Sequence, residues 1–232
     1  ARASVFRVML PSGHGSAFAV GPDLLVTNAH VADGADPGDP RVFVLNELGR
    51  HDVVESWVSD EADLALLRVD HDGLEPLPLC AADAQRDTAV WALGYPGVNL
   101  LTENDPVAEI SEGILNQYAE VARLRDFGAR VAIHSADINN GSSGGPLLNM
   151  EGVVVGVNAG SAELTSMQAY EIGVRAPGAN KVAVPAALLI EGAEDRALPA
   201  TFQTRSCTPA ETGPSKVVLA VSLGVALLTG IG

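Results

Sequence analysis

A serine that lies among glycines is the first candidate for a catalytic residue in this sequence. Residues 141–146 read Gly-Ser-Ser-Gly-Gly-Pro, and glycine lets the backbone turn sharply enough to aim amide N–H groups at a nearby oxygen. The segment suits a nucleophilic Ser143, with the amides of Gly141 and Ser143 as an oxyanion hole. Taken alone, a serine and glycine run is equally typical of a flexible loop. The interpretation therefore depends on partners elsewhere in the chain.

Two other segments supply a base and an acid. His30 ends an apolar strand segment, and histidine exchanges a proton near neutral pH. Asp63 leads directly into the apolar residues 64–67, where a half-buried carboxylate can accept the imidazole N–H and leave the other ring nitrogen free for the serine proton. One histidine of five and one acid of 29 are more often structural or solvated. The other four histidines, at positions 14, 51, 71 and 134, have no comparable setting.

Short β-type runs separated by turn residues must position these groups. With 24 glycines, 14 prolines and 19% charged residues, the composition favours many short strands and tight turns over a helical bundle. We expect an all-β barrel or sandwich, with one helix at residues 185–191 that closes the domain. The expected strands are residues 5–10, 16–20, 24–27, 42–45, 53–58, 64–69, 89–93, 107–118, 131–134, 146–148, 153–158 and 169–173.

The end of the sequence has a different composition. Residues 193–216 are rich in Glu, Ala, Pro, Thr and Ser, which predicts a linker and a domain over residues 1–192. Residues 217–232 carry no charge and as a helix would span about 24 Å, somewhat less than the roughly 30 Å of a hydrocarbon core. We interpret them as the start of a transmembrane helix. A buried element docked on the domain and a removable anchor signal are the alternatives.

Charge and cysteine content exclude some classes of function. The formal net charge of -15 opposes binding by phosphate neutralisation, so we expect no nucleic acid partner. The two cysteines, Cys80 and Cys207, are too few and too far apart for a zinc site, and we expect no metal and no organic cofactor. They form either one disulfide bridge or two buried thiols.

The three segments in the order His, Asp, Ser resemble the chymotrypsin-type fold, and among its members the bacterial HtrA/DegP-type proteases. The resemblance covers about residues 4–191 and includes Gly15-Ser16-Ala17-Phe18, Leu93-Gly94-Tyr95-Pro96 and Asp137-Ile138-Asn139. It implies two six-stranded antiparallel β-barrels with the site between them. Barrel one, about residues 4–96, would carry His30 and Asp63, and barrel two, about residues 107–184, would carry Ser143. The join would lie between residues 96 and 107.

The resemblance also implies a function. A serine endopeptidase of this type hydrolyses peptide bonds of extended or unfolded polypeptide through an acyl-enzyme, with His30, Asp63 and Ser143 as the catalytic residues. The strand edge at Val157, Asn158, Ala159 and Gly160 would pair with substrate backbone, and Asp137 and Asn139 would be further substrate-binding residues. Asp137 lies six residues before Ser143, the offset at which trypsin has the acid that selects Arg or Lys. An ordinary core strand is the alternative for residues 157–160.

Two departures from the family limit what can be carried over. Ser142 stands where these proteases often have asparagine and where digestive trypsins have the aspartate that captures a new amino terminus, so that activation switch looks absent. No peptide-binding PDZ module follows the domain in this sequence. In an oxidising compartment, a bridge between Cys80 and Cys207 would tie the linker back against the first barrel. We expect an extracytoplasmic protein, held at a membrane by residues 217–232.

The alternative function is a protease-like binding module, tethered to a membrane, that has lost turnover through misaligned geometry. An esterase is a weaker alternative. Residues 141–145 fit the short pattern Gly-x-Ser-x-Gly, but the residue order is wrong for an α/β-hydrolase and the flanking chain reads as strands.

Overall fold

The computed structural model describes residues 1–59, 61–97, 107–120, 130–164, 178–195 and 202–207. A 3₁₀ turn at Arg2–Ser4 leads into six antiparallel strands that close into the first barrel in the order β1-β2-β3-β6-β5-β4. The strands are β1 Val5–Leu10, β2 Gly13–Ala19, β3 Leu24–Thr27, β4 Phe43–Asn46, β5 Gly49–Val58 and β6 Ala65–Val69. Helix α1, Ala29–Ala32, is a single turn after β3. Inward side chains such as Phe6, Leu25 and Leu67 are fully buried and fill this barrel.

The second barrel also has six antiparallel strands, and the β11–β12 pairing closes it. They are β8 Thr88–Gly94, β9 Glu109–Glu120, β10 Arg130–His134, β11 Pro146–Leu148, β12 Val154–Leu164 and β13 Gly178–Pro185. Two short strands, β7 Leu79–Cys80 and β14 Thr204–Arg205, extend the sheet from β12 by parallel pairing. Leu115, Ala132 and Leu147 lie at the centre of its core. The all-β prediction and the two six-stranded barrels are confirmed.

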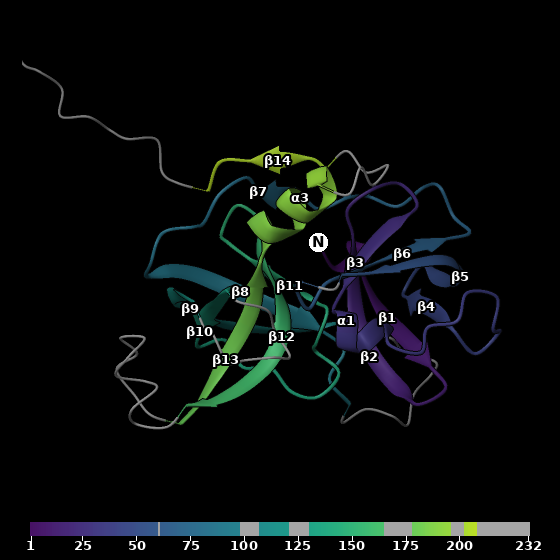
Figure 1. Cartoon of the computed structure of the whole chain (residues 1–232), viewed down its shortest axis with the longest axis horizontal. Coiled ribbons are helices and arrows are strands. Elements are labelled where there is room, and N and C mark those ends of the chain that lie inside the picture. Colours follow the sequence, from purple (N-terminus) through teal and green to yellow (C-terminus); the bar gives the residue numbers. More distant parts are fainter. Residues whose placement is uncertain (60, 98–106, 121–129, 165–177, 196–201, 208–232) are drawn as a thin grey trace, which may run out of the picture.

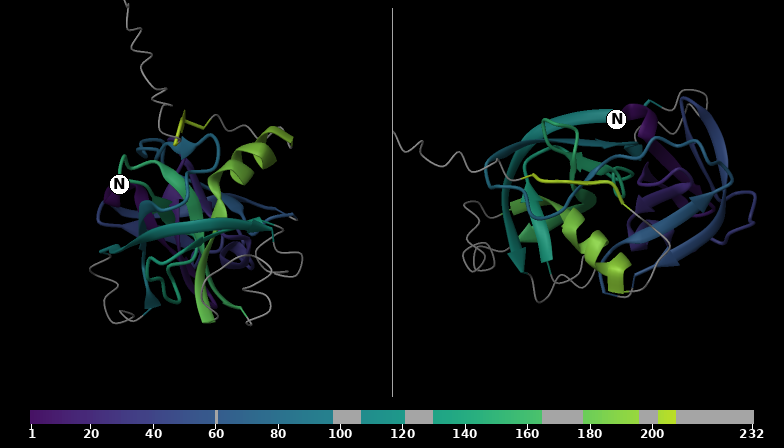
Figure 2. Two further views of the ribbon diagram at one scale, coloured as in Figure 1. Left: turned by 90° about the vertical axis from the view of Figure 1, so that its left-hand side faces the viewer. Right: turned by 90° about the horizontal axis from the view of Figure 1, so that it is seen from above.

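A third apolar cluster joins the barrels. Phe18 and Val26 from the first barrel belong to the same buried cluster as Leu93, Leu148 and Val157 from the second. Figures 1 and 2 show the barrels side by side, with α3 (Ala186–Asp195) and β14 at one end of the second barrel. Because this cluster is continuous, its burial holds the first-barrel and second-barrel halves of the site against each other.

The predicted join between the barrels was wrong. Strand β8 was assigned to barrel one, about residues 4–96, but it pairs with β9 from Thr88↔Leu115 to Gly94↔Glu109 and with β11. The chain crosses between the barrels after β6 and before β7, at residues 70–78, and barrel two begins well before residue 107. An apolar strand suits either barrel equally. Its partners are set by pairing with distant strands, which local sequence does not reveal.

The end of the folded domain was also misplaced. Helix α3 runs over Ala186–Asp195 where residues 185–191 were predicted, and Pro185 ends β13. Part of the predicted 193–216 linker belongs to the domain, because β14 pairs with β7 and Cys207 forms a disulfide with Cys80, their Cα atoms 5.5 Å apart. Polar side chains do not prevent this, because main-chain hydrogen bonds and the disulfide hold the segment. The disulfide ties the segment to the second barrel, not to the first as expected.

The predicted membrane segment, residues 217–232, lies outside the described residues. Among the residues that are described, no helix is both long enough and apolar enough to cross a bilayer.

Candidate active site

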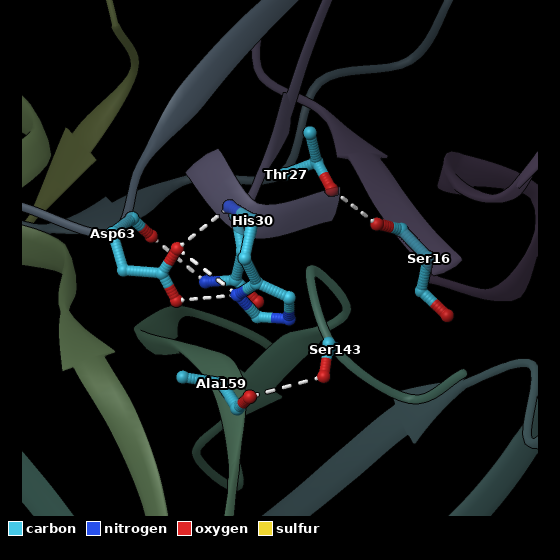
Figure 3. A network of polar contacts seen from close by, with 7 residues as sticks. Ser16, Thr27, His30, Asp63, Ser143 and Ala159 are labelled. Atoms are coloured by element: carbon cyan, nitrogen blue, oxygen red, sulfur yellow. Dashed lines mark hydrogen bonds and ion pairs between the residues drawn. The ribbon is translucent and has the colours of Figure 1, made fainter. Parts of the chain in front are cut away.

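The first barrel holds His30 and Asp63 against each other. His30 lies in α1, immediately after β3, and Asp63 precedes β6, which pairs with β3. The Asp63 carboxylate accepts hydrogen bonds from the His30 ring Nδ1, at 3.0 Å to Oδ1 and 2.8 Å to Oδ2, and from the His30 backbone N–H at 3.0 Å. Asn28 Nδ2 donates to the Asp63 carbonyl oxygen at 2.9 Å. Both the ring and the backbone of the histidine are therefore oriented by one aspartate (Figure 3).

The burial of the two partners differs. The Asp63 side chain is 2% exposed and that of His30 is 45% exposed. An ionised carboxylate only accepts hydrogen bonds, so the proton of a neutral His30 lies on Nδ1. The lone pair on Nε2 is then free on the side of the ring away from Asp63. Figure 3 shows the His30 ring between Asp63 and Ser143.

The second barrel supplies Ser143 on a loop before β11. Gly141 and Gly144 have φ of +95° and +87°, a conformation that glycine adopts without strain. A Cβ on Gly144 would overlap the Ser16 carbonyl oxygen and Thr27 Oγ1, so the loop approaches the first barrel more closely than any side chain allows. The glycines predicted as a sharp turn therefore serve two purposes, turning the loop and docking it on the other barrel.

Ser16 of β2 fastens this loop. Its N–H donates to the Ser143 carbonyl oxygen at 2.8 Å, and its Oγ donates to the Gly141 carbonyl oxygen at 2.7 Å. Thr27 Oγ1 donates to the Ser16 carbonyl oxygen at 2.7 Å (Figure 3), and the Tyr95 N–H donates to Ser16 Oγ at 2.9 Å. Hydrogen bonds to one residue of the first barrel thus fix the position of the serine loop. Ser16 is part of the family motif Gly15-Ser16-Ala17-Phe18, and the sequence alone indicates no role for its side chain.

The amides of Gly141 and Ser143 donate to no residue that the structure describes. Their neighbours are occupied: the N–H of Ser142 donates to the Asn139 carbonyl oxygen at 2.9 Å, and that of Gly144 donates to the Asn158 carbonyl oxygen at 2.7 Å. The geometry leaves the two predicted oxyanion-hole donors available for an anionic oxygen.

The Ser143 hydroxyl makes a different contact from the predicted one. Its Oγ donates to the Ala159 carbonyl oxygen at 3.0 Å, and no hydrogen bond to His30 is among the contacts of the described residues. Catalytic hydrogen bonds are often long or misaligned without substrate. In this structure the base and acid are engaged, whereas the serine side chain rests on β12 (Figure 3).

The predicted substrate strand divides into core and surface positions. Val157 and Asn158 are fully buried, and Asn158 Nδ2 donates to the Pro146 carbonyl oxygen at 3.2 Å. The Asn158 N–H donates to the Gly145 carbonyl oxygen at 2.8 Å, so this residue braces the serine loop with both its backbone and its side chain. A register shift between Asn158 and Gly160 leaves Ala159 out of the β13 pairing. Ala159 and Gly160 are the positions beside the hydroxyl and the cavity.

A cavity of about 790 Å³ opens beside Ser143. Asn139 and Gly160 line it, together with Ile138, Asn140, Ser161 and Lys181, and His14 lies on its wall. Asp137 does not line it. That side chain is 83% exposed and borders a smaller neighbouring cavity of about 230 Å³. The sequence offset that suggested an acid in the pocket therefore does not place one there.

Sequence reasoning missed Lys181 and His14. Lys181 reaches the cavity because β13 pairs with β12, which sets it opposite Ser161. His14 Nε2 lies next to Gly141, and burial followed by the charge of Arg7 lowers the pKa of its imidazole, against a hydrogen bond with the Tyr95 backbone. No local pattern around either residue indicates a site; a map of strand pairing would be needed to find them.

The site residues are suited to acid–base and nucleophilic chemistry. An oriented imidazole, a hydroxyl on a loop docked against the first barrel and two amides without a partner among the described residues are the groups that acyl transfer requires. Among the described residues, no cluster of three or more His, Cys, Asp or Glu side chains is arranged to hold a metal ion.

Comparison with known proteins identifies the family of the chain. Residues 15–157 match the family of trypsin-like peptidase domains. Serine protease Rv3671c of Mycobacterium tuberculosis is 33% identical over 149 residues, which are 64% of this chain and 36% of that protein. The mitochondrial serine protease HTRA2 of Bos taurus is 35% identical over 157 residues, 64% of this chain and 32% of that protein. The chain thus matches about a third of the length of these relatives.

The same mycobacterial protein provides a structural comparison. The crystal structure of the active form of the Rv3671c protease superposes with a TM-score of 0.65 and 23% sequence identity, covering 89% of this chain and 86% of that one. At that identity the likeness establishes the two-barrel fold.

Proposed function

The chain belongs to the family of trypsin-like peptidase domains, and we propose that it is a serine endopeptidase that cleaves protein chains through an acyl-enzyme. One observation carries the proposal. The buried Asp63 carboxylate binds both the ring and the backbone N–H of His30, while Ser16 docks the Ser143 loop against the same barrel. A protein that used this surface only for binding would have no need of an imidazole held with its Nε2 free toward a serine.

The proposed reaction has two steps. Ser143 turns its hydroxyl from the Ala159 carbonyl oxygen toward His30 and attacks the substrate carbonyl carbon as its proton passes to Nε2. The oxyanion accepts hydrogen bonds from the Gly141 and Ser143 amides, and the Asp63 carboxylate stabilises the imidazolium. His30 then gives its proton to the departing amine. Water, deprotonated by His30, attacks the ester, and the carboxylic acid product leaves as Ser143 regains its proton.

Fluorophosphonate labelling tests this proposal. We expect the reagent to form one covalent adduct per chain, detected by mass spectrometry, and the adduct to be absent from Ser143→Ala. Ser56→Ala is the matched control, since Ser56 lies on β5 and its Oγ donates only a long 3.5 Å bond to the Ala35 carbonyl oxygen. A correctly folded wild-type chain that is not labelled would refute the enzymatic function.

A non-catalytic peptide-binding module is the second candidate. It is favoured by the contact that Ser143 Oγ makes with the Ala159 carbonyl oxygen in place of His30. Under this alternative the hydroxyl stays on β12 when peptide binds. Peptide binding by the wild-type chain, with neither labelling nor cleavage, would support it.

The substrates and location are part of the proposal. The Ala159–Gly160 edge beside the serine suits an extended or unfolded polypeptide that adds as a strand. The Cys80–Cys207 disulfide suits an oxidising, extracytoplasmic compartment. Tethering by residues 217–232 would hold the enzyme at a membrane. Vesicle co-sedimentation of the chain with and without residues 217–232 tests the tether, and equal sedimentation would exclude it.

A further inference from the structure

A lysine side chain lies in the wall of the cavity beside the nucleophile. Lys181 comes from β13, between β10 and β12, and is one of only two lysines in the chain. Its side chain is 21% exposed, and it shares the 790 Å³ cavity with Ser143, Ile138 and Asn139. A charged group in a cavity wall that is mostly removed from water lowers the free energy of unfolding unless a partner compensates the charge.

The protein compensates this charge only in part. The Lys181 ammonium donates to the Ile138 carbonyl oxygen at 2.8 Å and to Ser161 Oγ at 3.2 Å. Both acceptors are neutral, and an ammonium has three N–H donors, so one donor and the charge itself remain. The two bonds also hold the ammonium at a fixed place in the cavity wall. The nitrogen is therefore positioned for an anionic oxygen.

Asp137 is the one carboxylate near this ammonium among the described contacts. Its Oδ1 is 3.7 Å from Lys181 Nζ, longer than a hydrogen bond, and its side chain is 83% exposed. Water and salt screen such a pair, so it neutralises little of the charge. None of the described residues that line the cavity is acidic. The cavity is thus positive in a protein whose formal net charge is -15.

We propose that Lys181 makes this cavity selective for an acidic side chain, so that the enzyme cleaves after Glu or Asp. This rests on the proposed function, since the cavity next to Ser143 receives the side chain of the residue whose carbonyl carbon is attacked. The substrate carboxylate accepts the third N–H of Lys181. The same ammonium opposes Lys and Arg side chains, because burying two like charges together is unfavourable.

Peptides that differ only at the residue before the cleaved bond test this assignment. We would measure kcat/KM for fluorogenic peptides with Glu, Gln, Leu and Lys at that position, per mole of chain labelled by fluorophosphonate. We expect Glu to be cleaved about 10- to 100-fold faster than the uncharged Gln, the range typical of a charged hydrogen bond. Lys181→Met should bring Glu and Gln to within about threefold of each other, and Lys181→Arg should retain the preference.

The control is Arg41→Gln. It removes one positive charge from a side chain that is 70% exposed and bonded to Asp39 in the first barrel. If the preference reflected overall charge, Arg41→Gln would reduce it as much as Lys181→Met does. A wild-type preference for Leu or Lys, or a Glu preference that survives Lys181→Met, would overturn the proposal. Cleavage after Lys that Asp137→Asn abolishes would assign selection to Asp137 instead.

A binding measurement separates failure of this inference from failure of the proposed function. Fluorescence anisotropy with the Ser143→Ala chain compares labelled product peptides that end in Glu, in Gln or in Lys. Tighter binding of the Glu peptide, lost in the Ser143→Ala, Lys181→Met double variant, would support the pocket assignment even for a chain without turnover. Equal binding of the three peptides would overturn it even for an active enzyme.

Discussion

The two barrels contribute to the site in different states. On the first barrel, Asp63 already binds His30 through ring and backbone. On the second, the Gly141 and Ser143 amides are in place, but the Ser143 hydroxyl donates to Ala159. The difference follows from packing. Asp63 is buried beneath His30 and held by hydrogen bonds from its ring and backbone, whereas a serine hydroxyl on the surface of a loop rotates at little cost. The general base is therefore already oriented for catalysis, whereas the nucleophile must still rotate.

Removing the charge of Asp63 should have the largest effect. In Asp63→Asn the side-chain amide donates to the histidine, which moves the ring proton from Nδ1 to Nε2 and leaves no base facing Ser143. We expect kcat/KM to fall by about 10³- to 10⁴-fold. Asp39→Asn, which changes the hydrogen-bonding partner of the exposed Arg41, is the control. A loss of kcat/KM of less than about tenfold in Asp63→Asn would mean that Asp63 on the first barrel does not orient His30 for catalysis.

Adding a methyl group to Gly144 should displace the second-barrel loop that carries Ser143. Gly144→Ala combines a φ of +87° with overlap on the Ser16 carbonyl oxygen and Thr27 Oγ1, so the loop must leave the first barrel. We expect the free energy of unfolding to fall by about 3 kcal/mol or more, together with loss of labelling.

Gly38→Ala is the matched control for that variant. Its φ is +94°, but a Cβ there meets nothing within 4 Å. Strain without overlap should cost about 1 kcal/mol in urea unfolding. Equal losses in the two variants would show that the contact with Ser16 does not hold the serine loop in place.

Acid should weaken the second barrel through His134. This histidine is 2% exposed on β10, and burial, followed by the charge of Lys181, lowers its pKa to about 4. The unfolded chain then binds more protons than the folded chain between about pH 6.5 and 4. Stability is present above pH 6.5, falls as the pH falls, and is lost by up to about 3 kcal/mol near pH 4.

His134→Leu isolates that contribution. The variant has no imidazole to protonate, so urea unfolding free energies measured at pH 7 and pH 4 should differ less than in the wild-type chain. If wild type and variant lose the same stability between these values, His134 is not the group responsible for acid sensitivity.

Sequence order and local pattern predicted much of the site. His30 and Asp63 each adjoin an apolar strand, and Ser143 lies among glycines, so their chemical types and settings were visible without coordinates. The all-β class followed from the same turns and strands. Asp137 shows the limit of such reasoning, because its offset from Ser143 matches that of trypsin's pocket acid, whereas its side chain is 83% exposed and borders a neighbouring cavity.

What the sequence determined by itself is the all-β class, most of the barrel strands, the turn residues and the chemical groups next to them, because these depend on neighbours in the chain. Strands β7, β13 and β14 were not among the expected strands, and the strand expected at residues 169–173 lies outside the described residues. Tertiary structure alone decided that β8 joins the second barrel, that Cys207 returns to Cys80, that Ser16 holds the serine loop and that Lys181 lies in the cavity. Each of these depends on pairing between residues far apart in sequence. The packing of the whole barrel determines such pairing, so it cannot be predicted from a local sequence pattern.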